Sequence, residues 1–328
     1  MPRVTVHQIA RTATDALIAH GAGPDQAAHV ARAVARAEAT GNAICGLYYL
    51  ESYCLQLRSG RVDGTVSPVV TRPRPGAVMA DARFGFAQPA FAAGLETAVQ
   101  AARSNGVATL AVAHAHTCTS LGYFTEQIAA AGLIGIGFTN ASPVVAPPGG
   151  NAAVIGTNPI AMTVPGPQAP LMHFDFSTSA VALGKITMAK AAGQPIPLGW
   201  AVDADGQPTT DPAAALQGAL VSAGGYKGWG FGLMAEIMAA ALTGSVNALD
   251  VKGLKLPDGP PHDLGQFYIL IDHATHGDHL ATRFARIADA VAQQEGTRIP
   301  GANRQTMSDV DVPDALWSLC TALAIPAV

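Results

Sequence analysis

The sequence predicts an α/β protein in which strands and helices do not alternate regularly. Apolar runs at residues 107–113 and 133–139 have the length and composition of buried strands, and each follows a helical pattern. Residues 140–166 then form a loop-rich stretch instead of another helix–strand unit. The GxGxxG fingerprint of a Rossmann fold is absent, since the nearest run, GWGFG at 228–232, has a different spacing. The predicted fold is therefore α/β but not Rossmann.

The first part of the chain is predicted to begin with helices. Residues 5–20 and 25–40 carry helical patterns, separated by a glycine-rich break and followed at once by Pro24, which suits a first helical turn. The next pattern places Tyr49 and Tyr53 four residues apart, so that on a helix both share one face.

Strands, loops and helices follow in the rest of the chain. Residues 60–81 predict short strands with a crossing connection, and a helix at 89–104 ends at an Asn-Gly pair. A helix at 121–131 precedes the strand at 133–139, and a further strand is expected at 171–176. The predicted elements after it are a helical stretch at 177–193, an apolar helix that ends at Thr243, a strand at 266–272 and a helix at 278–295.

The composition limits the possible partners. The chain has 328 residues, of which 49% are hydrophobic and only 13% charged, a low charge content for a protein surface. An oligomer that buries part of the surface explains this value, and a surface rich in glycine, alanine and serine is the alternative. The net charge of −4 argues against nucleic acid as a partner. No apolar run approaches the roughly 20 residues of a membrane span.

Cysteine and histidine positions indicate neither disulfides nor a metal centre. No CxxC spacing occurs among the four cysteines, Cys45, Cys54, Cys118 and Cys320. We therefore expect free thiols in a reducing cytoplasm, and the charged N-terminal pattern is not that of a signal peptide. His114 and His116 would share one strand face with Cys118, but no HExxH motif or suitably spaced carboxylate accompanies them. We expect no bound metal.

A series of motifs resembles one enzyme family over nearly the whole chain. In order, these are GLIGI followed by TN, APPGG, GTNPIA, HFDFSTSA, DADGQPTTDP, GGYKGWG and TRIPGANR. Together they are similar to the type 2 malate/L-lactate dehydrogenase family, which consists of NAD(P)-dependent oxidoreductases. The segment DARFGFAQPAF is most similar to the Δ1-piperideine-2-carboxylate/Δ1-pyrroline-2-carboxylate reductases of that family.

The resemblance implies a fold and a domain arrangement. The expected fold is the non-Rossmann type 2 malate/L-lactate dehydrogenase fold, with a mostly antiparallel central sheet and a helical terminal region. Residues 1–58 and about 280–328 would form the helical, substrate-side region, residues 59–117 a small α/β region, and residues 118–279 the NAD(P)-binding domain. Family members are homodimers, which fits the low charge content.

The resemblance also implies a nicotinamide cofactor, NADPH, with NADH as the alternative. Backbone amides of glycine, serine and threonine turns would hold the pyrophosphate, and a lysine would add positive charge. The implied cofactor-binding residues are Thr139, Asn140, Thr157, Asn158, Asp175, Ser177, Thr178, Gly184, Lys185, Tyr226, Lys227 and Arg304.

The sequence departs from the family at the substrate end. The family signature Asp-Ser-His-Gly is followed by an Arg four residues after the His and a Tyr eight residues after it. Here Cys45 stands at the His position and Tyr49 at the Arg position, while Tyr53 is retained. We also assign the family's second His, in Asn-Ser-x-His-Phe-Gly, to Thr117.

These departures require another proton donor. We predict that His116 donates the proton, with His114 as the alternative, and that Asp175 orients the donor imidazole. The residues expected to shape the substrate end are Cys45, Tyr49, Tyr53, His114 and Thr117.

The predicted reaction is hydride transfer from NADPH to the C=N carbon of a small cyclic imine carboxylate, such as Δ1-piperideine-2-carboxylate or Δ1-pyrroline-2-carboxylate. The protein would supply the proton. Loss of the Arg weakens this prediction, because a tyrosine does not replace a bidentate carboxylate clamp. A 2-hydroxy acid dehydrogenase of the malate, lactate, sulfolactate or ureidoglycolate type is the alternative. A catalytically silent NAD(P)-binding regulator is the alternative of another class.

Overall fold

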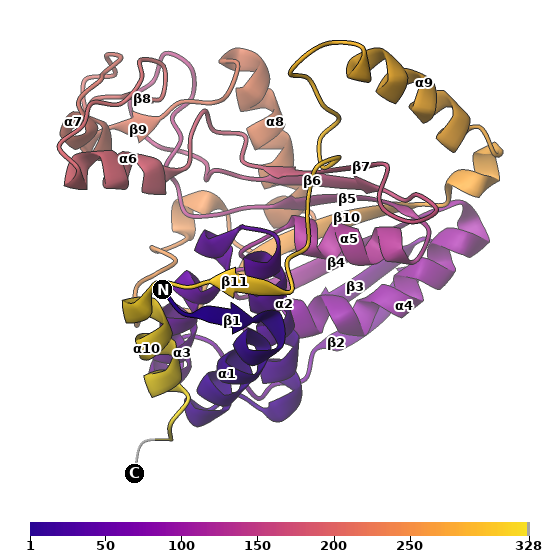
Figure 1. Ribbon diagram of the computed structural model, residues 1–328, viewed down its shortest axis with the longest axis horizontal. Coiled ribbons are helices and arrows are strands. Elements are labelled where there is room, and N and C mark those ends of the chain that lie inside the picture. The colour runs from indigo at the N-terminus through magenta and orange to yellow at the C-terminus, as the bar shows by residue number, and fades with distance from the viewer. Residues whose placement is uncertain (327–328) are drawn as a thin grey trace.

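The centre of the protein is a seven-stranded β-sheet (Figure 1). The structure is a computed structural model that describes residues 1–326. The strands of the sheet are, in spatial order, β2 (Val69–Arg74), β3 (Ala77–Asp81), β4 (Val107–Ala115), β10 (Leu264–Ile271), β5 (Ile134–Thr139), β6 (Ile160–Val164) and β7 (Met172–Phe176). Among these strands β3 and β4 run parallel, and every other neighbouring pair is antiparallel. The prediction of a mostly antiparallel sheet is confirmed.

Two helices pack against this sheet and form the largest core with it. Helix α4 (Ala87–Asn105) contacts β3 and β4, and α5 (Gly122–Ala130) contacts β5 and β6. The core between them contains the aromatic rings of Phe91, Phe124 and Tyr268, which meet edge to face or tilted. Helix α4 ends where Gly106 adopts the left-handed φ of +80°, as its Asn-Gly stop signal predicts.

The N-terminal helices and the C-terminal segment pack together in a separate layer (Figure 1). This layer contains β1 (Arg3–Thr5), α1 (Val6–Ala19), α2 (Pro24–Ala39), α3 (Leu50–Ser59), β11 (Asp309–Asp311) and α10 (Asp314–Leu323). Strand β11 pairs with β1, and α10 packs on α1 and α3. The two ends of the described chain therefore meet. Helix α9 (Leu280–Ala292) lies apart from this layer, beside the sheet.

A third layer carries small elements with their own apolar core. It contains α6 (Leu183–Ala191), β8 (Ala201–Val202), α7 (Pro212–Gln217) and β9 (Ala219–Leu220). Helix α8 (Tyr226–Glu236) continues as a π-helical turn, Ile237–Ala241, that contacts β10 and β5. Within residues 1–326, four short 3₁₀ helices lie at Ala43–Cys45, Leu47–Tyr49, Ala248–Asp250 and His273–His276.

Local signals explain where several helices begin. Thr5 caps α1, because its hydroxyl accepts from the Gln8 backbone N–H while the Gln8 side chain accepts from the Thr5 backbone. Pro24 occupies the first turn of α2.

The central sheet runs through both of the predicted regions 59–117 and 118–279, so these regions share one layer. Within residues 1–326, no helix has both the length and the apolar character needed to cross a bilayer.

Candidate active site

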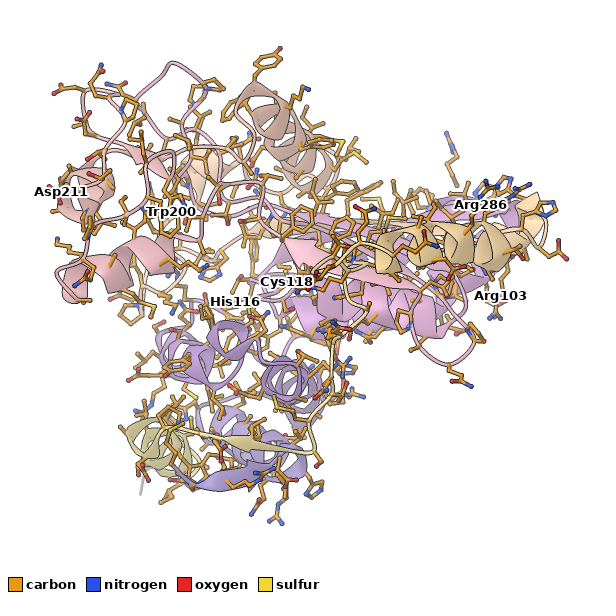
Figure 2. All side chains as sticks on the ribbon, turned by 45° about the horizontal axis from the view of Figure 1, so that its top comes forward. Arg103, His116, Cys118, Trp200, Asp211 and Arg286 are labelled. Carbon is orange, nitrogen blue, oxygen red and sulfur yellow. The ribbon has the colours of Figure 1, made fainter. Side chains whose placement is uncertain are left out.

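A small cavity opens where the N-terminal helices meet the central sheet. Its volume is about 240 Å³. Figure 2 marks Cys118, one of its lining residues, at this junction. The lining residues are Ile44, Cys45, Tyr49, Thr117, Cys118, Thr119, Thr139, Asn140, Ala141, Thr157, Pro159, Leu254 and Lys255. The structure thus brings together predicted substrate-side and predicted cofactor-side residues that are up to 112 residues apart in sequence, from Cys45 to Thr157.

Cys45 lies at the edge of this cavity, at the end of the first 3₁₀ helix. Burial and, to a smaller extent, the nearby Asp175 carboxylate raise the pKa of the Cys45 thiol to about 11. A hydrogen bond from Asn42 and the charge of Lys255 act in the opposite direction on this pKa. The thiol therefore carries its proton at neutral pH.

Tyr49 forms one wall of the cavity, and its hydroxyl is hydrogen-bonded to the protein backbone. Its hydroxyl donates a hydrogen bond to the carbonyl oxygen of Leu254 over 3.0 Å. Burial raises the pKa of the Tyr49 hydroxyl, so that the group stays neutral. The Lys255 ammonium nitrogen lies 5.4 Å from the centre of the Tyr49 ring. Tyr53 is fully buried behind Tyr49, with ring centres 4.9 Å apart, and does not line the cavity.

Lys255 is a cavity residue that the sequence analysis missed. It lies in a segment between helix α8 and strand β10 that carries no recognisable motif. Two lysines three residues apart in a turn-rich stretch, VKGLK, look like ordinary surface residues. Its contact with Tyr49 joins positions 206 residues apart, so only the tertiary structure reveals it.

Two non-glycine residues beside the cavity have left-handed backbone conformations. Thr119 has a φ of 59° and Asn158 a φ of 32°. The Asn158 amide is held by Gly232 O at 3.0 Å and by the Glu236 carboxylate at 2.7 Å. Such strained positions persist only where surrounding contacts hold them, and they cluster at functional sites. Asn158 is completely buried and supports the wall of the cavity behind Thr157.

His116 is buried in the core and is not among the cavity's lining residues (Figure 2). Its Nε2 lies 2.6 Å from Oε1 of Gln56, and its ring stacks on His262 with centres 3.9 Å apart. The Gln56 amide nitrogen donates to two carbonyls, so its oxygen must accept, and Nε2 of His116 therefore carries the hydrogen. Burial lowers the pKa of His116 far below its usual value, and the neighbouring His262 and Arg61 act in the same direction. The ring is therefore neutral, and this placement does not fit a proton donor to the cavity.

His114 and His116 do not share one face, contrary to the expectation from an HxH pattern. Strand β4 ends at Ala115, and His114 itself has a left-handed φ of 51°. The His114 ring is half-exposed, and its Nδ1 lies within hydrogen-bond distance, 2.8 Å, of the Asp263 carboxylate. The backbone turn at His114 separates the two rings, so neither one reaches the small cavity.

A larger cleft adjoins the small cavity and contains Asp175. Its volume is about 740 Å³. The lining residues are Thr40, Gly41, Asn42, Ser120, His173, Phe174, Asp175, Phe176, Arg298, Gly301, Asn303 and Arg304. Asn42 links the cleft and the cavity, because its carbonyl accepts from the Cys45 backbone N–H and its amide donates to Ser120 Oγ over 3.5 Å.

Asp175 is oriented by the start of helix α5 and not by a histidine. One oxygen accepts from the Gly122 backbone N–H at 2.7 Å and from Ser120 Oγ at 3.2 Å. Burial raises the Asp175 pKa, and these two hydrogen bonds oppose that effect. Among the residues described here, neither His114 nor His116 hydrogen-bonds to Asp175, so the predicted carboxylate–imidazole pair does not form.

The Asp175 contacts also correct the assignment of the family's second His. Counted back from Gly122, the motif Asn-Ser-x-His-Phe-Gly places its His on Ser120 and its Asn on Thr117. Ser120 touches Asp175, whereas Thr117 lines the small cavity. Gly122 is needed at its position, because a Cβ there would lie 2.8 Å from His173 and 2.9 Å from Asp175.

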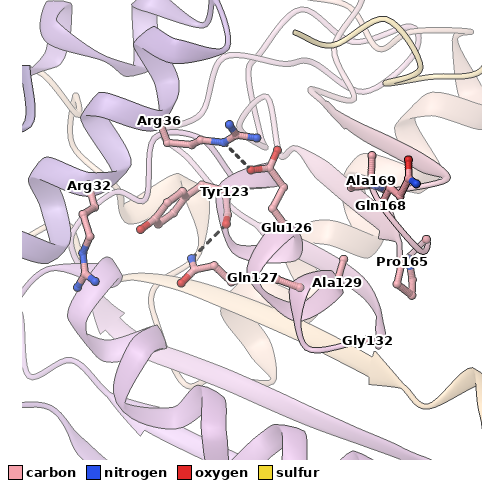
Figure 3. Close-up of a pocket in the computed structure, with 13 residues that line it drawn as sticks. Arg32, Arg36, Tyr123, Glu126, Gln127, Ala129, Gly132, Pro165, Gln168 and Ala169 are labelled. Carbon is pink, nitrogen blue, oxygen red and sulfur yellow. Dashed lines mark hydrogen bonds and ion pairs between the residues drawn. The ribbon is translucent and has the colours of Figure 1, made fainter. Parts of the chain in front are cut away.

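Arg304, an expected cofactor residue, lines the large cleft. It forms an ion pair with Glu126, which also accepts a 2.9 Å hydrogen bond from Arg36 Nε. Glu126 and Arg36 both line a neighbouring hollow, whose volume is about 640 Å³. Figure 3 shows their contact. Glu126 thus holds Arg304 at the cleft, where Arg298 adds a second positive charge.

The cleft and cavity fit a nicotinamide dinucleotide in their chemistry. The two arginines and the polar groups of Ser120 and Asn303 suit an anionic ligand. The buried Asn158 Oδ1 has no hydrogen-bond partner among the described residues, which leaves an acceptor near Thr157. Other predicted cofactor residues lie outside the lining of both spaces: Ser177 and Thr178 after β7, Gly184 and Lys185 at the start of α6, and Tyr226 and Lys227 at the start of α8.

The central sheet is mostly antiparallel, the two cavities adjoin each other, and the sequence has no glycine-rich phosphate loop. Together these features define an α/β enzyme of non-Rossmann type. Comparison with known proteins identifies it further. The chain belongs to the malate/L-lactate dehydrogenase family, which matches residues 4–315. It is an oxidoreductase of that family, and the resemblance and fold class expected from the sequence are confirmed.

Three relatives illustrate the similarity. The chain is 38% identical to a Δ1-pyrroline-2-carboxylate reductase of Ancylobacter novellus, over 97% of this chain and 95% of that protein. It is 36% identical to a (2R)-3-sulfolactate dehydrogenase (NADP⁺) of Chromohalobacter salexigens, over 99% of both chains. The crystal structure of Δ1-piperideine-2-carboxylate reductase from Pseudomonas syringae superposes with a TM-score of 0.92 at 33% identity, covering 98% of this chain and all of that one. These relatives support a nicotinamide cofactor.

Proposed function

We propose that the protein reduces a small cyclic imine carboxylate, such as Δ1-pyrroline-2-carboxylate or Δ1-piperideine-2-carboxylate, with NADPH. The observation that carries this proposal is the small cavity, which Cys45 and Lys255 line together with the predicted cofactor-binding residues Thr139 and Thr157. Its volume of about 240 Å³ suits a ring of five or six atoms with one carboxylate. Relatives named as reductases of these two imines also support the proposal.

In this proposal the cofactor lies in the large cleft, with its nicotinamide end toward the small cavity. Arg298 and Arg304 bind phosphate groups, and their two charges favour NADPH over NADH. When bound, the nicotinamide supplies a hydride to the C=N carbon. The N-terminal layer forms the substrate side through Cys45 and Tyr49, and the 118–279 region forms the cofactor side.

The proton comes from Cys45 in this proposal, which replaces the earlier assignment to His116. The thiol hydrogen passes to the imine nitrogen as the C=N carbon gains the hydride, so that a secondary amine forms. The thiolate then takes a proton from water. Asp175 supports this step, because its charge helps to keep the pKa of Cys45 at about 11 and so keeps the thiol protonated before the reaction.

NADPH oxidation by the purified protein tests the proposal. The two cyclic imines are compared with pyruvate, oxaloacetate and 3-sulfopyruvate at equal concentrations. We expect kcat/KM for an imine to exceed that for each oxo acid. Higher values for an oxo acid would replace the proposal with a 2-hydroxy acid dehydrogenase, as the sulfolactate dehydrogenase relative suggests. Cofactor binding without turnover of any compound would favour the silent regulator.

We also propose a cytoplasmic homodimer. Helix α8 and its π-helical continuation expose apolar side chains, including Phe231 at 57%, Leu233 at 41% and Ile237 at 49%. A second copy that covers this face would account for so much exposed apolar surface. The four free cysteines support a reducing compartment. Sedimentation tests the dimer, because Phe231→Lys should shift the protein toward monomer. A monomeric wild type would refute the dimer. Cell fractionation tests the compartment.

A further inference from the structure

Lys255 supplies the positive charge of the small cavity. It is the only cationic side chain among the thirteen lining residues, all of which lie in the described part of the chain. A carboxylate that enters such a confined space loses hydration, which is costly unless a positive group compensates for it. The position at which the family carries an Arg is occupied here by Tyr49, so that compensation must come from another segment.

The segment that carries Lys255 is held firmly by helix α3. Gln56 Nε2 donates to the carbonyls of Leu254, at 2.9 Å, and Leu256, at 2.7 Å, which flank Lys255 on either side. Arg61, only 1% exposed, also donates to the Leu256 carbonyl and to two further carbonyls of the segment, those of Gly253 and Pro260. The backbone at Lys255 is thus fixed, and only its side chain must be ordered when a ligand binds.

Tyr49 completes the arrangement as a platform for the ammonium group. Because its hydroxyl already donates a hydrogen bond to the Leu254 carbonyl, the part of Tyr49 that remains for contact with a ligand is mainly its ring. The Lys255 nitrogen lies 5.4 Å from the ring centre, within the range of a cation–π contact. Lys255 and Cys45 line the same cavity, and the charge of Lys255 lowers the pKa of the Cys45 thiol.

We propose that Lys255 binds the substrate's carboxylate and so replaces the missing family Arg from a different segment of the chain. This inference rests on the proposed function, in which the cavity takes a carboxylate-bearing substrate. A lysine offers a point charge and not a bidentate fork, so it fixes the carboxylate less strictly than an arginine would. The site would therefore accept rings of five and six atoms.

Two measurements test Lys255. The first is steady-state reduction of Δ1-pyrroline-2-carboxylate and of Δ1-pyrroline, which lacks the carboxylate. The second is calorimetric binding of pyrrole-2-carboxylate, a flat mimic of the substrate, and of its uncharged carboxamide, both with NADP⁺ present. Lys255→Gln should raise KM and Kd for the two carboxylates about 10- to 100-fold, as loss of a charged hydrogen bond predicts, with kcat within about threefold. The uncharged compounds should be unaffected.

Two control variants separate this role from a structural one. Lys255→Arg should restore most of the affinity, and Lys252→Gln, an exposed lysine of the same segment that does not line the cavity, should behave as wild type. Three outcomes would overturn the inference. Wild type and Lys255→Gln could bind pyrrole-2-carboxylate equally, Lys255→Gln could lose as much affinity for the carboxamide as for the carboxylate, or wild type could bind no pyrrole-2-carboxylate at all. Lys255-dependent binding without imine turnover would instead overturn the proposed function alone.

Discussion

His116 Nε2 lies 2.6 Å from Gln56 Oε1, and this contact connects the end of strand β4 to helix α3. The Gln56 amide nitrogen in turn donates hydrogen bonds to the carbonyls on both sides of Lys255. His116 therefore supports a wall of the small cavity from behind. A neutral, completely buried imidazole in this position contributes to the structure and does not line the small cavity.

We predict that His116→Asn lowers stability far more than it lowers catalysis. The shorter side chain loses the hydrogen bond to Gln56 and the stacking on His262, at a cost of about 1–3 kcal/mol. Urea unfolding should register this loss, while kcat in the folded protein stays within about threefold of wild type. A variant of full stability with kcat reduced about 100-fold would restore His116 as the proton donor.

Removal of the Cys45 thiol is predicted to slow the reaction without weakening cofactor binding. Cys45→Ala should lower kcat about 100-fold, the lower end of the range for loss of a general acid. The Kd for NADPH, measured by fluorescence, should stay near the wild-type value. Cys320→Ala is the matched control, because Cys320 is buried in the N-terminal layer and its loss should affect stability only.

The same assignment predicts a pH profile for kcat. The donor must be protonated, and burial holds the pKa of Cys45 at about 11. The rate of reduction should therefore be level from pH 7 to 9.5 and fall as the pH approaches 11, with circular dichroism used to verify folding. A fall in kcat around pH 6.5, where an ordinary histidine titrates, would argue for an imidazole donor instead.

Stability is predicted to decrease in acid because buried histidines stay neutral in the folded protein. Burial lowers the pKa of His262 to about 3 and that of His173 to about 4, whereas in the unfolded chain both titrate near 6.5. Between these values the unfolded state binds more protons, so the stability present above pH 6.5 is lost as the pH falls toward 4 and 3. Chemical denaturation from pH 8 to 4 measures this slope.

His262→Gln should make that slope shallower, because one of the contributing groups is gone. His276→Gln is the control, since His276 is exposed. Identical slopes for wild type and His262→Gln would show that His262 does not contribute to the pH dependence.

A Cβ at Gly122 is predicted to disturb the Asp175 site. Gly122→Ala places that atom 2.8 Å from His173 and 2.9 Å from Asp175, which forces both side chains to move, at a cost of about 1–3 kcal/mol. The Kd for NADPH should rise as well. Gly230→Ala in α8, where nothing lies within 4 Å of the new atom, should be neutral or slightly stabilising. Equal melting temperatures for the two variants would contradict this prediction.

Local signals in the sequence predicted most elements of the fold. The helices expected at 5–20 and 25–40 are observed at Val6–Ala19 and Pro24–Ala39, because caps and breaks act within a few residues. The strand expected at 133–139 is observed at Ile134–Thr139. The position of β10 between β4 and β5 could not be derived from these patterns, because strand pairing depends on contacts between distant segments.

The candidate site was predicted in part. Motifs pointed to Cys45, Tyr49 and Thr157, and these residues do line one cavity. The expectation from the HxH pattern was wrong because His114 adopts a left-handed backbone conformation near the end of β4, which no periodicity reveals. Lys255 was missed because its importance arises from backbone contacts made by α3, about 200 residues earlier in the chain.

A crystal structure of the complex with NADP⁺ and pyrrole-2-carboxylate tests most directly whether the reaction takes place at Cys45. We expect the nicotinamide ring where the cleft meets the small cavity, with the ligand between its C4 atom and Cys45 Sγ. The ligand's carboxylate should point toward Lys255. A nicotinamide ring bound outside these two spaces, or a C4 atom that faces His116, would contradict the account.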